Sequence, residues 1–147
     1  MVSRYGIHTI ELFHRVSKKD FNKVFHSLKS LNSGNFYPDT TYHSGKGMTK
    51  YICTSYCNQG VVLYLYQQVR SKNKTKKNHA PFIHFRLNPH TLLHGEYSPK
   101  KVFQAEANQL KSLDKEMTKL LHKIGLNCEF EQLTLSRIDC CLDYFPD

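Results

Sequence analysis

Hydrophobic and polar positions recur along this chain with two different periods, which predicts both strands and helices. Residues 5–13 (YGIHTIELF) are rich in β-branched and aromatic side chains, and this composition favours a strand. In the next segment, apolar residues return at the 3, 4, 7 spacing of one helical face, and Ser17 with Asp20 forms a capping pair at its start. We therefore predict a helix over about residues 18–31.

The middle of the chain has the pattern of a three-stranded meander. Residues 49–57 and 61–69 read as strands joined by a hairpin turn at Asn58-Gln59-Gly60. The second of these strands is nearly all apolar at its start, so we expect it to be central in the sheet. A polar, basic loop at 71–80 leads to a third strand at 82–88.

The last third of the chain predicts a long helix and a final strand. Ser98-Pro99 is a typical helix start, and Gly125 is placed to end the helix after about 26 residues. The apolar face of this helix is formed by Phe103, Leu110, Leu113, Met117, Leu120, Leu121 and Ile124. A final strand follows at 133–145, and a short strand at 128–131 precedes it.

This order of elements predicts an α+β fold with a mainly antiparallel sheet of about five strands and two helices packed on one face. The length of 147 residues corresponds to one domain, 1–147. The chain stops almost directly after a strand suited to a core. We therefore leave open whether it is a fragment of a longer protein.

The composition predicts a cytoplasmic protein. It has no apolar run of about 18 residues and no signal-peptide core, so we expect no membrane partner. Five cysteines without a zinc-finger spacing fit a reducing compartment.

Charge is concentrated in the middle of the chain. The formal net charge is +9, and residues 40–95 contain no Asp or Glu. The basic residues in this block are Lys46, Lys50, Arg70, Lys72, Lys74, Lys76, Lys77 and Arg86. Because ordinary solvated surfaces mix both signs, a block without carboxylates indicates an anionic partner.

The same block is rich in Tyr and Phe, and this combination favours nucleic acid. Phosphates pair with Lys and Arg, and unpaired bases stack on aromatic rings. We predict DNA as the partner, with RNA or an acidic protein as alternatives. A purely structural interpretation buries the rings in the sheet and leaves the lysines on a solvated hairpin tip.

The final strand carries charged residues among apolar ones. Alternation places Arg137, Asp139 and Asp143 on the same side of the strand. Asp139 and Asp143 are four residues apart, about 13 Å along a straight strand, so they cannot share one cation. Asp139 is the candidate metal ligand, for Mg²⁺ or Mn²⁺, and pairing with charges on neighbouring strands is the alternative.

Two segments carry a resemblance to a known family. SRIDCCLDY (136–144), together with FRLNPHTLL (85–93) and the long helix between them, resembles the amino-terminal portion of replication initiation proteins of small plasmids, phages and other mobile elements. The resemblance covers mainly residues 82–145. It implies a sheet that binds origin DNA and an acidic residue of the last strand that helps to hold a divalent cation.

The chain departs from that family in its catalytic residues. The His-apolar-His metal motif of many rolling-circle initiators is absent, because His84-Phe85-Arg86 has arginine at the second position, and no tyrosine stands in a recognisable nucleophile motif. We therefore leave enzymatic activity undecided and do not expect this chain alone to nick DNA. The alternative function is that of a small non-catalytic mobile-element protein that binds nucleic acid or a nucleic-acid-handling protein.

Overall fold

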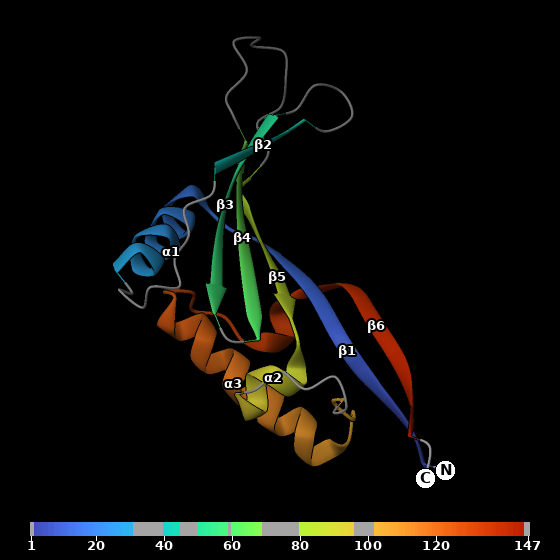
Figure 1. Ribbon diagram of the computed structural model, residues 1–147. Helices are drawn as coiled ribbons and strands as arrows, with labels where there is room; N and C mark the ends of the chain where they lie inside the picture. The colour runs from blue at the N-terminus through green and yellow to red at the C-terminus, as the bar shows by residue number, and fades with distance from the viewer. Residues whose placement is uncertain are drawn as a thin grey trace.

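The computed structural model describes residues 2–30, 40–44, 50–58, 60–68, 80–95 and 102–145. Within these ranges the fold is α+β, as predicted, with helices on one side of an antiparallel sheet (Figure 1). The elements follow in the order β1 (Val2–Arg15), α1 (Lys18–Ser30), β2 (Thr40–Ser44), β3 (Lys50–Asn58), β4 (Val61–Gln68), β5 (Phe82–Leu87), α2 (Pro89–His94), α3 (Ala107–Lys123), the 3-10 helix η1 (Phe130–Gln132) and β6 (Thr134–Phe145).

Six described strands form one sheet in the spatial order β2-β3-β4-β5-β1-β6, and every described strand pair is antiparallel. The predicted meander is confirmed, with β4 between β3 and β5. The first strand lies inside the sheet, between β5 and the last strand. Val2 pairs with Phe145, so the two ends of the described chain lie side by side (Figure 1).

One face of the sheet forms the core. On β4 and β5, alternate residues are buried, and Leu63, Leu65 and Phe85 have no exposed surface. They belong to the same cluster as Val24 and Leu28 of α1. Burying an aliphatic or aromatic side chain of this size contributes about 1.5–3 kcal/mol, so this packing fixes the helices on one face.

Helix α1 forms where the pattern predicted it. The Ser17 hydroxyl oxygen accepts a hydrogen bond from the Asp20 amide at 3.0 Å, which satisfies a backbone donor at the helix start. Phe21, Val24 and Leu28 are the buried face. The described helix covers Lys18–Ser30, and residue 31, the last one predicted, lies outside the described residues.

The long helix predicted from Ser98 is wrong over its first part. Helix α3 starts at Ala107, and Phe103 forms an isolated β-bridge with Ile7 instead of a helical turn. The Ile7 amide donates to the Phe103 carbonyl at 2.8 Å, and Phe103 is buried in the core. The side chain of Phe103 is therefore buried, as predicted, but its backbone is extended and not helical. The Ser98-Pro99 start lies outside the described residues.

Gly6 allows this bridge to form. A Cβ atom at Gly6 would overlap the Val102 side chain and come within 2.9 Å of the Phe103 carbonyl oxygen. Only a residue without a side chain admits such a close backbone approach. The segment that leads into α3 is thereby attached to β1.

Three smaller elements differ from the prediction. The segment 128–131 contains the start of the 3-10 helix η1, stabilised by a capping box between Glu129 and Gln132, in place of a short strand. Strand β2 occupies part of the turn-rich stretch and was not predicted. Helix α2, directly after β5, was also not predicted. None of the described helices is both long enough and apolar enough to cross a membrane.

Candidate nucleic-acid interface

The face of the sheet opposite the core is not covered by any described helix. Its residues follow from the strand registers, because side chains of directly paired residues point to the same face. Glu11 of β1 pairs with Arg86 of β5 and with Arg137 of β6, and Arg86 pairs with Val62 of β4. We call this surface the open face; its residues are Glu11, Phe13, Arg15, Val62, Tyr64, Tyr66, Phe82, His84, Arg86, Arg137 and Asp139.

Two stacked ring pairs lie on the open face where β4 and β5 run side by side. Tyr64 and His84 have ring centroids 5.7 Å apart at an interplanar angle of 27°. Tyr66 and Phe82 lie 4.7 Å apart at 15°. All four side chains are partly exposed, so neither pair is sealed in the core.

An arginine borders the second ring pair. The Arg15 guanidinium lies over the Phe82 ring, 5.8 Å from its centroid, and Arg15 is exposed. A guanidinium at this distance is attracted by the ring's electron-rich face and keeps several N–H donors accessible. The aromatic rings and the Arg15 guanidinium therefore lie next to each other on the open face.

A row of charges crosses the other end of the open face. Glu11 lies between two arginines, with a carboxylate oxygen 3.8 Å from Arg86 Nε and the other 4.0 Å from Arg137 Nη1. Arg137 Nε also donates a hydrogen bond to Asp139 Oδ1 at 2.7 Å. This hydrogen bond and the charge of Asp139, with a contribution from Glu11, raise the pKa of the Arg137 guanidinium.

His84 lies between the aromatic and the charged parts of the open face. Burial is the main cause that lowers the pKa of its imidazole below the usual 6.5; Arg86 lowers this pKa further, and Glu11 opposes the shift. The lowered pKa favours the neutral form of His84 at pH 7. A neutral imidazole stacked on Tyr64 presents an aromatic surface with one ring donor and one ring acceptor.

The predicted phosphate-binding residues fall mostly outside the described part of the chain. Arg86 is on the open face and its side chain is 52% exposed. Lys50 is the first residue of β3, paired with Ser44. The others, Lys46, Arg70, Lys72, Lys74, Lys76 and Lys77, lie outside the described residues. Whether the basic block forms one surface stays a prediction.

Glu11 is the residue that sequence reasoning missed at this site. Residues 40–95 lack acids, but strand order places a carboxylate of the first strand beside Arg86. Arg15 and Arg137, from outside the basic block, share the same face. Within the open face, three arginines stand against the carboxylates Glu11 and Asp139, which leaves a net charge of +1.

The carboxylate of Asp139 has an arginine partner in the structure. Its carboxylate is bonded to Arg137, and no group of three or more His, Cys, Asp or Glu side chains in the described ranges is placed to hold a metal ion. A bound Mg²⁺ or Mn²⁺ needs several oxygen ligands. The metal role of Asp139 stays a prediction, and no chemical step is derived from it.

A pair of histidines on α2 was also missed, although its signal is present in the sequence. His90 and His94 are four residues apart, and α2 brings their rings to a centroid distance of 4.5 Å. The expected helix start lay further along the chain, so this spacing was not recognised as one helical turn.

No protein family matches this chain, and no curated protein is significantly similar to it.

Proposed function

We propose that this chain is a nucleic-acid-binding domain that binds DNA on the open face, with unpaired bases stacked on the rings of β4 and β5. The observation that carries this proposal is the exposure of two stacked ring pairs, Tyr64–His84 and Tyr66–Phe82, on a sheet face bordered by arginines. Large aromatic side chains normally contribute most when they are buried. Rings left partly exposed beside cationic groups are the arrangement that binds single strands.

The resemblance to replication initiation proteins of mobile elements supports the same proposal. The segment that carries it, 136–144, lies in β6, next to β1 and at the charged end of the open face. Arg137 and Asp139 of this segment point to that face together with Arg86. We propose a role in origin recognition on this basis, with the basic residues at 46–77 as additional phosphate contacts.

Binding to single-stranded DNA tests the proposal. Fluorescence anisotropy of a labelled 20-nucleotide strand is measured with the full chain between 50 and 200 mM salt. Base stacking contributes about 1–3 kcal/mol per base, so Tyr64→Ala or Phe82→Ala is expected to weaken binding about 5- to 150-fold. The matched control is Tyr5→Ala, a tyrosine that is 74% exposed on β1 on the side of Ile7, away from the open face.

Three outcomes separate the functional alternatives. Tight, salt-dependent binding that both ring variants weaken and Tyr5→Ala does not supports the open face. Binding that no ring variant changes assigns the interface to other residues. For nicking, supercoiled plasmid incubated with the chain and Mg²⁺ or Mn²⁺ stays unchanged under the binding-only proposal, and a nick abolished by Asp139→Ala would contradict it.

A further inference from the structure

The two histidines of α2 lie one above the other on the same helical face. Residues four apart in a helix are neighbours on its surface, and the rings of His90 and His94 have centroids 4.5 Å apart at an interplanar angle of 36°. His94 is exposed and His90 partly exposed. Paired imidazoles at this helical spacing are also how metal-binding helices present two nitrogen ligands to one zinc ion.

Helix α2 holds this pair in a fixed position. The Asn88 side-chain oxygen accepts a hydrogen bond from the Thr91 amide at 3.0 Å, and Pro89 at the helix start is buried. At the other end, Gly95 adopts a left-handed conformation with φ of 80°, and its amide donates to the Thr91 carbonyl at 2.8 Å. Because both ends are capped, the helix backbone that carries the two imidazoles needs little ordering before they bind a ligand.

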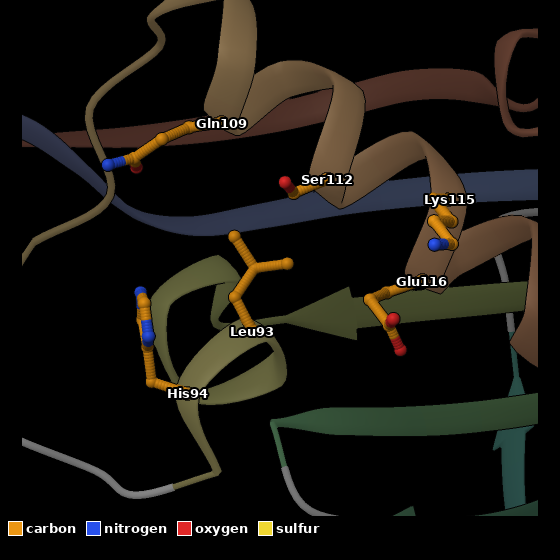
Figure 2. Close-up of a pocket in the computed structure, with 6 residues that line it drawn as sticks. All are labelled: Leu93, His94, Gln109, Ser112, Lys115 and Glu116. Carbon is orange, nitrogen blue, oxygen red and sulfur yellow. The ribbon is translucent and has the colours of Figure 1, made fainter.

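The surroundings of His94 offer space and oxygen donors. His94 lines a hollow of about 310 Å³ between α2 and α3, together with Gln109, Ser112 and Glu116. In Figure 2, Leu93 of α2 lies between the His94 ring and the Glu116 carboxylate, so Glu116 is on the far side of the hollow. Lys115 also lines the hollow and His90 does not, so the hollow adjoins only the His94 end of the pair.

We propose that His90 and His94 together bind one divalent transition-metal ion, each through one ring nitrogen. Nitrogens that share an ion at about 2.0–2.1 Å lie about 3 Å from each other, and ring centres 4.5 Å apart permit this separation. Imidazole ligands select Zn²⁺, Ni²⁺ or Cu²⁺, whereas Mg²⁺ and Ca²⁺ require oxygen ligands. The site is therefore chemically distinct from the cation expected at Asp139 and does not depend on the proposed function.

Titration with Ni²⁺ tests this site directly. Because Cys140 is exposed and thiolates also bind transition metals, the full chain is used with Cys140→Ser. Calorimetry at pH 7.5 is expected to show one ion per chain. In ¹H–¹⁵N spectra, the paramagnetic ion is expected to broaden the amide signals of residues 89–95 first. Mg²⁺ at the same concentration is expected to produce no change.

Single substitutions identify the ligands. His94→Ala and, separately, His90→Ala are expected to lower the Ni²⁺ affinity at least about tenfold, because each removes one of the two protein ligands. The matched control is His122→Ala, an exposed histidine on α3 without another histidine one turn away. Wild-type affinity in His94→Ala, or an equal loss in His122→Ala, would overturn the proposal. Circular dichroism of each variant verifies that it remains folded.

Discussion

Replacing Glu11 with glutamine removes the carboxylate that lies between two arginines of the open face. Glu11 is within 4.0 Å of Arg86 and Arg137, and its side chain is only 15% exposed. In this position it offsets the charge of two arginines to which the proposed function assigns phosphate contacts. Glu11→Gln keeps the size of the side chain and raises the net charge of the open face from +1 to +2.

The gain in DNA affinity follows from counterion release. Each additional phosphate contact with a single strand adds about −0.7 to the slope of log affinity against log salt. At 0.1 M salt, one additional contact corresponds to about fivefold tighter binding. We therefore expect Glu11→Gln to bind single-stranded DNA about fivefold more tightly at 0.1 M salt, with a steeper salt dependence. The cost in stability is small, because Arg86 is 52% exposed and an ion pair with a solvent-exposed partner contributes about 1 kcal/mol or less.

Anisotropy titrations at four salt concentrations measure both the affinity and the slope. Glu116→Gln is the matched control, since it makes the same change of charge on α3, where Glu116 pairs with Lys119 at 3.4 Å. Equal gains in Glu11→Gln and Glu116→Gln would show a general effect of net charge. Unchanged affinity and slope in a folded Glu11→Gln variant would refute the role of the open face.

Three further predictions concern pH, packing and thiol chemistry. The lowered pKa of His84 means that the unfolded chain binds a proton more readily, so stability is expected to fall as the pH drops below 6.5; pH-dependent urea unfolding should show a smaller decrease in His84→Gln. Gly6→Ala forces the backbone near Phe103 to shift and is expected to cost about 2–4 kcal/mol, from overpacking and a weakened hydrogen bond. A thermal melt like that of the wild type would contradict that packing argument. Maleimide should label exposed Cys140 well before Cys128, whose pKa is raised by burial and by Glu129; equal labelling rates in the folded chain would contradict this.

Elements with local signals were predictable from the sequence. The Ser17 cap and the apolar spacing of Phe21, Val24 and Leu28 define α1 within a few consecutive turns. Gly125 follows the end of α3, as predicted. Its φ is 92°, and the Leu126 amide donates a hydrogen bond to the Leu121 carbonyl. In each case the residues that decide the structure are close together in the chain.

Elements that depend on distant partners were not predictable in the same way. Phe103 has a position that fits the apolar face of a helix, yet its backbone pairs with Ile7 of the first strand. Strand β2 lies in a stretch of turn-forming composition and is defined by its ladder with β3. Helix α2 had local signals in Asn88, Pro89 and Gly95, but its six residues are too few for a periodic pattern.

The charges of the candidate site also depend on residues that are distant in the sequence, so they could not be predicted from the sequence alone. A count along the chain assigns Arg86 to a block without acids, whereas the strand order β5-β1-β6 places Glu11 between Arg86 and Arg137. If one arginine of the open face contacts a phosphate, the salt slope on single-stranded DNA is only about −0.7. Six phosphate contacts by the basic block would give about −4 on single-stranded DNA and about −5 on duplex DNA. A shallow slope with strong dependence on Tyr64 therefore means that stacking dominates binding, and a steep slope means that the lysines between residues 46 and 77 contribute directly.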